Sequence, residues 1–578
     1  MARQTGNIKW IEWSNEAFKR AKLENKPILL DISAVWCHWC HRLDQDTYSV
    51  PEIAEYIESH FIPIRVDTDK RPDINRRYNM GGWPTTAFLT PDGNVLSGGT
   101  YFPPDQMKQL LRDVYSEWSK SKGQTTASIS PLEPENLPSG EIGISIVDEV
   151  LGEVANNFDP LYGGFGSQPK FPNTDAVELA LLKYHYTGNR EILKITTTTL
   201  DHAGQGGIYD HEMGGFFRYS TVRDWSIPHY EKMSEDNAKW LRLYVHAYQA
   251  TGNRFYADIA RGIVEYIKTW LSDQDNGGFY GSQDADEEYY KLNKDERAKK
   301  EPPYIDKHIY TNWNALMISS FFEASFTLGD PSLRDFGLKS IRRLMSLNYD
   351  QNGMSHFYDA QPQLLNQLAD QMHTVRTLCH TYEVTGDSSF LQLAEKLVEA
   401  AHGLFDGEHG GFSDTLADPT APGFLSKPVK PLDDNSVAVQ ALVKLHHLTG
   451  EESYRTMAME TLKRFAGIFP QFSIMAADYA LAVDAFLNEP TMIRIIGSLE
   501  KPQTTELLSE VNRIYEPRKI IQVLNPNRDQ EHILKFGYTL TTEPTVYVCL
   551  GKLCTSPITE PGRIAPELAR MIAVQPRL

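Results

Sequence analysis

The sequence is poor in cysteine, has no surplus of positive charge and contains no long apolar run. Five cysteines in 578 residues exclude a small secreted scaffold held together by disulfides. Lys and Arg number 57 against 76 Asp and Glu, a net charge of -19, so we expect no nucleic-acid partner. No stretch of about 18 apolar residues occurs and no apolar segment follows the start. We expect a soluble, cytoplasmic protein without a membrane partner.

The remaining composition is that of an ordinary globular chain, with 41% hydrophobic and 23% charged residues. At roughly 150 residues per domain, the length predicts three or four domains. The pattern divides the chain into an α/β domain (1–122), a linker rich in Pro, Ser and Glu (123–141), a helical domain (142–488) and a small α/β tail (489–578). The predicted fold class is therefore multidomain, α/β plus all-α.

Residues 8–122 alternate helix and strand signals around a Cys-x-x-Cys motif. An apolar strand at 27–32 precedes Trp-Cys-His-Trp-Cys-His (36–41), and a second strand at 61–66 follows. A cysteine at a helix start is favoured as a thiolate by the partial positive charge there. Cys37 is thus the expected nucleophile, and Cys40, one turn later, is placed to resolve a mixed disulfide. His38 between them adds positive charge.

This segment resembles the thioredoxin superfamily. The resemblance implies that Asp31 is a buried proton-relay carboxylate and that Pro84, in Gly-Gly-Trp-Pro-Thr (81–85), is a cis-proline next to the disulfide. Trp36 and Trp39 would shape the surface for a protein thiol partner. Two alternatives remain: a redox motif kept only for structure, and a zinc site using Cys37, Cys40 and His41. We expect neither a metal nor another cofactor.

Two signals recur between 142 and 488 and indicate a helical repeat. Tight turns after apolar helices end in Gly188, Gly252, Gly329, Gly386 and Gly450, and Gly-Gly-Phe recurs in long connections at 163–165, 214–216, 277–279 and 410–412. Short turns at one end and long loops at the other predict twelve helices in six hairpins, a closed (α/α)6 six-hairpin toroid. One alternative for the polar residues at the helix starts is simple capping.

Polar and aromatic residues gather at the mouth where the long loops enter this toroid, as in sugar-binding clefts. The candidate ligand-binding residues are Lys170, His211, Arg218, His229, Glu231, Asp236, Asp284, Asp286, Trp313, Asn314, Asp370 and Asn435.

The chain also resembles the spermatogenesis-associated protein 20 family, in which a thioredoxin-like domain precedes a six-hairpin glycosidase-like barrel. Besides the motifs at 36–41 and 81–85, the resemblance rests on Gly-Gly-Phe-Gly (163–166), Pro-Lys-Phe-Pro (169–172), Pro-His-Tyr-Glu-Lys-Met (228–233), Asp-Ala-Asp (284–286) and Trp-Asn-Ala-Leu-Met (313–317). The resemblance covers essentially the whole chain and implies this architecture.

Three functions fit the barrel. A glycoside hydrolase needs two carboxylates, for which Glu231, Asp236, Asp284 and Asp286 are the candidates. A sugar epimerase or isomerase needs a base, for which His211, His229 and His373 are the candidates. The third hypothesis is a non-catalytic barrel that binds a glycan or peptide beside the redox domain. The sequence carries no signal for an oligomeric state.

The tail contains strand signals at 492–496, 520–523 and 546–549. Cys549 and Cys554 flank a Gly-Lys turn, and we expect two buried reduced thiols, with a disulfide or a secondary redox relay as the alternative. Cys379 lies in a helix, where packing is its expected role.

Overall fold

The computed structural model describes residues 8–121, 139–541 and 543–574. The chain folds into two compact units. Unit 1 comprises the described residues before 122 together with two later segments, Ser282–Asp306 and Ser413–Val429. Unit 2 comprises 139–281, Lys307–Phe412 and the described residues from Lys430 onwards. The linker expected at 123–141 lies almost wholly outside the described residues.

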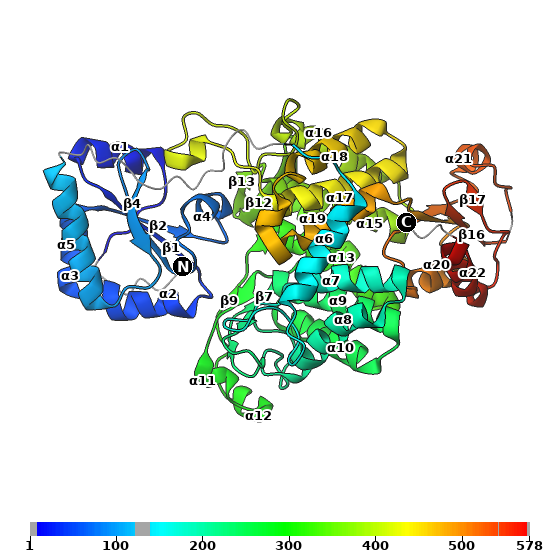
Figure 1. The fold of residues 1–578 in the computed structure, drawn as a ribbon, viewed down its shortest axis with the longest axis horizontal. Coiled ribbons are helices and arrows are strands. Elements are labelled where there is room, and N and C mark those ends of the chain that lie inside the picture. The colour runs from blue at the N-terminus through cyan, green and yellow to red at the C-terminus, as the bar shows by residue number, and fades with distance from the viewer. Residues whose placement is uncertain (1–7, 122–138, 542, 575–578) are drawn as a thin grey trace. The chain divides into compact units, whose positions relative to one another are not determined.

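Unit 1 is built on a four-stranded sheet in the order β2-β1-β3-β4, with β1 and β2 parallel and the other pairs antiparallel (Figure 1). Its strands are β1 (Ile28–Ser33), β2 (Ile62–Asp67), β3 (Thr85–Leu89) and β4 (Val95–Gly99). Its helices in this region are α1 (Asn15–Glu24), α2 (His38–Leu43), α3 (Pro51–His60), α4 (Pro72–Tyr78) and α5 (Pro104–Lys120). This is the expected thioredoxin-like arrangement.

Alternating side chains of β1 supply the two faces of this sheet. Ile28, Leu30 and Ile32 belong to one buried apolar cluster, whereas Leu29 belongs to a second cluster with Phe88. This is the period of two expected of a strand covered on both sides. Asp31 is therefore buried on the same side of the strand as Leu29.

The segment Ser413–Val429 is part of the core of unit 1. Phe424 packs in the first apolar cluster, and its ring stacks on Tyr78 at a centroid distance of 5.3 Å. The guanidinium of Arg77 donates two hydrogen bonds to the Asp414 carboxylate, of 2.7 and 3.0 Å. The chain thus returns, far along the sequence, to complete the thioredoxin-like unit.

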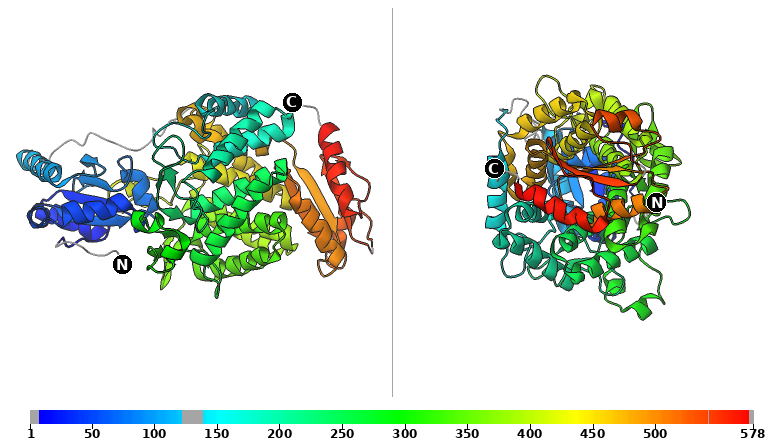
Figure 2. Two further views of the ribbon diagram at one scale, coloured as in Figure 1. Left: turned by 90° about the horizontal axis from the view of Figure 1, so that it is seen from below. Right: turned by 90° about the vertical axis from the view of Figure 1, so that its right-hand side faces the viewer.

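The helices of unit 2 form a closed double ring, seen end-on in the right-hand view of Figure 2. The inner helices are α7 (Thr174–Thr187), α9 (Ser234–Thr251), α13 (Thr311–Leu328), α15 (Leu368–Thr385), α17 (Leu432–Thr449) and α19 (Ala477–Leu487). The outer helices are α6 (Ile144–Asn157), α8 (Arg190–Gln205), α10 (Arg254–Trp270), α14 (Pro331–Asn348), α16 (Ser389–Ala400) and α18 (Glu452–Phe465). Each inner helix packs on the next, and α19 packs on α7 to close the ring. The (α/α)6 toroid is confirmed.

The tight turns have the conformation that their glycines predict. Five inner helices end at a glycine in the left-handed region, where a residue with a side chain would be strained. These are Gly188, Gly252, Gly329, Gly386 and Gly450.

The longer connections carry short strands and turns of helix. The strands are β5 (Tyr219–Ser220), β6 (Pro228–His229), β7 (Lys232–Met233), β8 (Ser282–Gln283), β9 (Ile305–Asp306), β10 (Ile309–Tyr310), β11 (Tyr349–Asp350), β12 (Gly353–Asp359) and β13 (Gln361–Leu365). The short helices are α11 (Glu287–Tyr290) and α12 (Lys294–Arg297).

The C-terminal part of unit 2 is a sheet in the order β15-β14-β16-β17. Its elements are β14 (Thr491–Ile496), α20 (Pro502–Arg513), β15 (Lys519–Leu524), α21 (Gln530–Lys535), β16 (Thr545–Leu550), β17 (Leu553–Cys554) and α22 (Ile564–Val574). β15 packs on α15 and α17, and α20 packs on α13. The small α/β tail is thereby attached to the inner ring.

Within the described part of the chain, no single helix is long and apolar enough to span a membrane. One bent pair, Glu452–Phe465 with Phe469–Leu487, meets the requirements of length and composition only when its two helices are joined across a bend of 107°.

Candidate functional site

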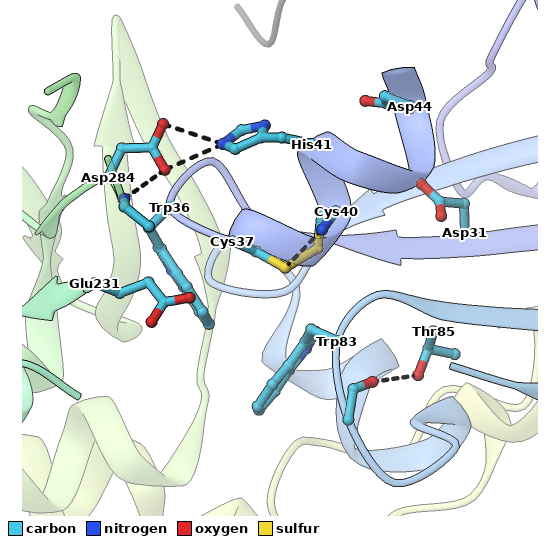
Figure 3. Close-up of a disulfide and its surroundings, with 12 residues drawn as sticks. Asp31, Trp36, Cys37, Cys40, His41, Asp44, Trp83, Thr85, Glu231 and Asp284 are labelled. Carbon is cyan, nitrogen blue, oxygen red and sulfur yellow. Dashed lines mark hydrogen bonds and ion pairs between the residues drawn. A yellow bond between two sulfur atoms is a disulfide. The ribbon is translucent and has the colours of Figure 1, made fainter. Parts of the chain in front are cut away.

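The two cysteines of the Cys-x-x-Cys motif lie at the start of α2 and are joined by a disulfide (Figure 3). Cys37 immediately precedes the helix, and its Sγ accepts a hydrogen bond of 3.1 Å from the backbone N–H of Cys40. Helix α2 continues without a break into a π-helical turn, Asp44–Tyr48. A backbone N–H aimed at Sγ would also stabilise the thiolate of the reduced form. The geometry suits an activated Cys37 that pairs reversibly with Cys40.

The two tryptophans of the motif have different environments. Trp39 is 44% exposed, and its ring lies 5.2 Å from that of Tyr101. Trp36 is 3% exposed, and its indole N–H donates a hydrogen bond of 2.6 Å to the Asp69 carboxylate. Trp39 is thus the exposed aromatic group, whereas Trp36 is anchored inside and does not form the surface expected from the sequence.

Asp31 is a buried carboxyl group in β1 with a guanidinium beside it. Its Oδ2 accepts a hydrogen bond of 2.7 Å from Arg65 Nε, and Arg65 also pairs with Asp44. Burial raises the pKa of Asp31 to about 6, although the Arg65 charge opposes this shift. Asp31 therefore changes protonation state in the range where a proton relay for a dithiol would act.

This pKa predicts the pH dependence of thiol exchange. If Asp31 takes the proton of Cys40, the rate of resolution rises with pH through about 6, where the Asp31 carboxyl ionises. We expect the Asp31→Asn variant to lose this inflection, because its amide cannot ionise. Acid-quenched alkylation after mixing the reduced protein with a disulfide peptide measures the rate. The control is Asp113→Asn, at an exposed position of α5, which should keep the inflection. An inflection that persists in Asp31→Asn would contradict the role of Asp31 as a proton relay.

The loop before β3 has the backbone that the thioredoxin resemblance implies. The Trp83–Pro84 peptide bond is cis. The Thr85 hydroxyl accepts a hydrogen bond of 3.0 Å from the N–H of Met80 and donates one of 2.8 Å to the carbonyl of Gly82. Trp83 contacts Trp36 edge to face, with ring centroids 5.9 Å apart. Pro84 is therefore held in place by its own loop.

Asp284, expected at the mouth of the barrel, belongs instead to unit 1. Its carboxylate lies 3.0 Å from Nε2 of His41, the residue after Cys40 (Figure 3). Burial lowers the pKa of His41, but the hydrogen bond and charge of Asp284, together with the charge of Asp44, outweigh burial and raise that pKa. Asp286 caps α11, since its side chain accepts a hydrogen bond from the N–H of Tyr289. For this residue the structure therefore agrees with helix capping, the alternative to ligand binding. An imidazole whose protonated form is favoured by Asp284 thus stands one residue beyond the disulfide.

The structure gives no support to a zinc site at the motif. Cys37 and Cys40 are joined to each other, so neither sulfur is a thiolate ligand. Among the described residues no group of three or more His, Cys, Asp and Glu side chains is arranged to hold a metal ion.

Three predicted ligand-binding residues of the barrel are used by the fold itself. Lys170 is fully buried, and its ammonium group binds the Asp159 carboxylate at 2.8 Å and the Gly163 carbonyl at 2.7 Å. The side-chain amide of Asn314 accepts a hydrogen bond from the backbone of Phe279 and donates one back to it. Asn435 does the same with the backbone of Phe412. These groups pin the Gly-Gly-Phe loops, so they are not free to bind a ligand.

The pinned loop is a structural repeat of the barrel. In each copy the backbone of an aspartate closes the turn onto its glycines, and the side chain of that aspartate accepts a hydrogen bond from a lysine or an arginine. The pairs are Asp159 with Lys170, Asp210 with Lys232, Asp273 with Arg343, and Asp406 with Lys430. The recurring Gly-Gly-Phe signal is thus explained by loop architecture.

Other predicted residues are dispersed. Asp370 is buried and paired with His356 at 2.9 Å. The ring of Trp313 packs against Tyr310, with centroids 4.8 Å apart. His211 is exposed, with Nε2 at 3.0 Å from the Gly206 carbonyl. None of the contacts described for these three joins them to the carboxylates on α7, α9 and α19.

His229 and Glu231 form a close pair in the loop that leads into α9. Nδ1 of His229 lies 2.7 Å from the Glu231 carboxylate, and its ring stacks on Tyr219. Glu231 is nearly fully buried, and its backbone carbonyl accepts a hydrogen bond from the N–H of Arg218. Glu231 and Arg218 act electrostatically on Asp236, in the first turn of α9. The structure therefore brings four of the predicted residues together: Arg218, His229, Glu231 and Asp236.

The inner helices add a network of charged and polar side chains, most of which sequence reasoning missed. His246 of α9 bridges Glu178 of α7, at 2.8 Å, and Glu323 of α13, at 3.2 Å. Arg376 of α15 donates a hydrogen bond of 3.1 Å to Gln440 of α17, which in turn donates one of 2.6 Å to Asp478 of α19. All six inner helices contribute to this network. Its sequence signal was a second helix face, as in the spacing of Asp236, Lys239, Arg242 and His246.

Several groups of this network have shifted pKa values. Burial and the neighbouring Asp175 raise the pKa of Asp478 to about 7. Burial and the neighbouring Glu235 raise that of Asp236 to about 6. Burial and the nearby Arg376 hold the pKa of His373 well below its usual value, and its Nδ1 has no hydrogen-bond partner among the described residues. The interior thus combines two carboxyl groups that change protonation state between about pH 6 and pH 7 with a neutral imidazole, a set able to exchange protons with a ligand.

The C-terminal cysteines differ from the expectation of two buried thiols. Cys549 and Cys554 form a disulfide, and Cys554 is exposed. The two residues face each other across the antiparallel strands β16 and β17, so the disulfide given above as the alternative is the one that the structure contains. Cys379 is buried and unpaired, as expected.

Comparison with known proteins agrees with this architecture. Residues 1–134 match the Thioredox_DsbH family model, described as "Protein of unknown function, DUF255". The chain is similar to human spermatogenesis-associated protein 20, at 25% identity over 705 residues, which covers 96% of this chain and 89% of the human protein. It is 23% identical over 103 residues to the disulfide bond reductase DsbH of Chlamydia pneumoniae, covering 16% of this chain and 61% of that protein. The family resemblance is thus confirmed along nearly the whole chain.

Two solved structures resemble the helical unit. One is a sugar epimerase from a ruminal bacterium, with 15% identity, a TM-score of 0.46 and coverage of 56% of this chain and 86% of that one. The other is a D-mannose isomerase, with 13% identity, a TM-score of 0.45 and coverage of 56% and 86%.

Proposed function

We propose that this homologue of spermatogenesis-associated protein 20 is a cytoplasmic dithiol–disulfide oxidoreductase whose barrel binds a polyhydroxylated, carbohydrate-like ligand. The observation that carries the redox proposal is the Cys37–Cys40 disulfide at the start of α2, with the N–H of Cys40 aimed at Cys37 Sγ. The similarity to a protein named disulfide bond reductase, over 103 residues, supports it.

The reaction is a two-electron exchange with a protein disulfide. In the reduced enzyme the Cys37 thiolate attacks one sulfur of the partner disulfide, a mixed disulfide forms, and the other partner sulfur leaves as a thiolate. The Cys40 thiol then gives its proton to Asp31 and attacks Cys37 Sγ, which releases the second partner thiolate. The partner gains two electrons and the enzyme ends with the Cys37–Cys40 disulfide. An external dithiol reduces it again.

The test traps the mixed disulfide. The full chain carrying Cys40→Ser, with Cys549 and Cys554 also replaced by serine, is mixed with a peptide that contains an internal disulfide. We expect intact-mass spectrometry to find one added peptide, attached at Cys37, because the resolving thiol is missing. A Cys37→Ser variant in the same background should add none. Absence of the adduct in Cys40→Ser would contradict the proposal.

The ligand proposal for the barrel rests on the interior network. Asp478, with a pKa of about 7, can donate a hydrogen bond when it is protonated and accept one when it is ionised, and Asp236, with a pKa of about 6, mainly accepts at neutral pH. The ionised Glu178–His246–Glu323 group holds fixed charge, and His373 offers an unpartnered nitrogen. Hydroxyl groups both donate and accept hydrogen bonds, so a polyol satisfies this mixed set better than an apolar ligand. Hydrolysis and epimerisation remain the alternative chemistries there.

Binding of saccharides tests this second proposal. We expect a neutral mono- or disaccharide to bind the full chain in calorimetric titration, and Asp478→Asn to weaken the affinity by about tenfold through the altered hydrogen bond. Asp258→Asn, an exposed change on outer helix α10, should leave the affinity unchanged. Equal effects of the two substitutions, or no binding from a panel of such sugars, would overturn it.

A further inference from the structure

The second disulfide spans a hairpin that needs no covalent link. Cys549 of β16 and Cys554 of β17 are direct cross-strand partners, and Leu550 pairs with Leu553 beside them. The backbone N–H of Thr555 donates a hydrogen bond of 2.9 Å to the Val548 carbonyl, which continues the pairing. A disulfide stabilises a fold mainly by closing a long loop in the unfolded chain. A loop as short as this one therefore adds little to the free energy of unfolding. Stabilisation of the fold is a weak reason for this bond.

The two sulfurs differ in access. Cys549 is 1% exposed, whereas Cys554 is exposed. An incoming thiolate therefore reaches Cys554 Sγ, and Cys549 Sγ is the sulfur that must leave.

A tyrosine hydroxyl and a guanidinium stand behind the leaving sulfur. The hydroxyl of Tyr538 lies 3.2 Å from Cys549 Sγ and 3.8 Å from Cys554 Sγ. Arg494 donates a hydrogen bond of 3.2 Å to the same hydroxyl oxygen. The Arg494 guanidinium is itself held in place, because its Nε donates a hydrogen bond of 2.8 Å to Gln522 Oε1. Because a guanidinium has no acceptor, the Tyr538 oxygen accepts from Arg494 and its own proton is free for the sulfur. The arrangement aims a polarised O–H group at a developing Cys549 thiolate.

We propose that Cys549–Cys554 is a second thiol–disulfide centre, which exchanges two electrons with an external dithiol. A thiolate of that dithiol attacks Cys554 Sγ, a mixed disulfide forms, and Cys549 leaves as a thiolate that receives the Tyr538 hydrogen bond. The second thiol of the external dithiol then loses its proton to solvent. The resulting thiolate attacks the other sulfur of the same dithiol, which is the one bound to Cys554. Cys554 is released as a thiolate, and the external dithiol becomes a disulfide. This centre is independent of Cys37 and Cys40.

The experiment follows each cysteine in the full chain carrying Cys37→Ser and Cys40→Ser. The protein is oxidised with glutathione disulfide, titrated with dithiothreitol, alkylated and analysed by peptide mass spectrometry. Cys379 is fully buried and unpaired, so its alkylation reports unfolding. We expect Cys549 and Cys554 to become alkylated reversibly while Cys379 stays protected. Labelling of the pair only together with Cys379, or failure of the oxidised pair to form, would overturn the proposal.

Tyr538→Phe tests the role of the hydroxyl. We expect reduction of the Cys549–Cys554 disulfide by dithiothreitol to slow by about tenfold, because the leaving thiolate loses a charge-assisted hydrogen bond. Tyr547→Phe is the matched control: its ring lies 4.3 Å from that of Tyr538, and it has no hydrogen bond to either sulfur among the described residues. Cys379 protection shows that each variant is folded. Equal rates in both variants would contradict the assignment of Tyr538 as the group that stabilises the leaving sulfur.

Discussion

Replacing Cys37 with serine is expected to lower the rate of disulfide exchange at this site by at least about a thousandfold, because an uncharged hydroxyl replaces the attacking thiolate. Cys40→Ser removes the resolving thiol and should stop turnover after a single mixed disulfide. The rate is measured as reduction of a disulfide peptide by the full chain with dithiothreitol as electron donor, after subtraction of the uncatalysed rate.

The C-terminal cysteines are removed in this experiment, and an exposed serine provides the control. Both variants carry Cys549→Ser and Cys554→Ser, so that the C-terminal pair cannot contribute. Ser49→Ala, at an exposed position of unit 1, should keep the full rate. Catalysis by Cys37→Ser at more than about a tenth of the parent rate would show that Cys37 is not the nucleophile.

Replacing Arg77 with methionine is expected to reduce the stability of unit 1 by about 3–5 kcal/mol, because it leaves a buried carboxylate without its partner. The side chains of Arg77 and Asp414 are 0% and 4% exposed. Arg77 also donates hydrogen bonds to the carbonyls of Phe424 and Lys427. Hydrogen exchange of the amides of β1 and β3 measures the effect, since unit 1 need not unfold together with the barrel.

An exposed pair in the same unit provides the comparison. Arg112 and Glu52 are 3.1 Å apart with side chains about 60% exposed, so Arg112→Met should leave the exchange of the same amides unchanged. If the amides of β1 and β3 exchange equally slowly in the Arg77→Met and Arg112→Met proteins, the segment at 413–429 does not hold unit 1 together.

The redox motif and the repeat were predictable because their signals are local. The Cys-x-x-Cys at a helix start needs only residues 36–41, and each inner-helix turn needs one glycine in the left-handed region, as at Gly188. The pairing of helices into a ring then follows from short turns alternating with long loops.

The roles of the polar residues were not predictable in the same way. Asn314 is a good ligand-binding residue by type, but here its amide closes on the backbone of Phe279, a partner 35 residues away. Asp284 belongs with His41, 243 residues earlier in the chain. Such choices depend on which distant groups fold against a side chain, and one sequence does not contain them. Capping and loop pinning therefore account for several predicted site residues.

The most direct test of the account is a redox titration of the Cys37/Cys40 pair in the full chain with Cys549→Ser and Cys554→Ser. Glutathione or dithiothreitol buffers set the potential, and alkylation with mass spectrometry reads the fraction reduced. We expect a reversible two-electron transition, in which the ratio of reduced to oxidised form changes tenfold for about 30 mV, with its midpoint within about 60 mV of the cytosolic glutathione potential. A pair that never forms a disulfide, or that is reduced only when the protein unfolds, would contradict it.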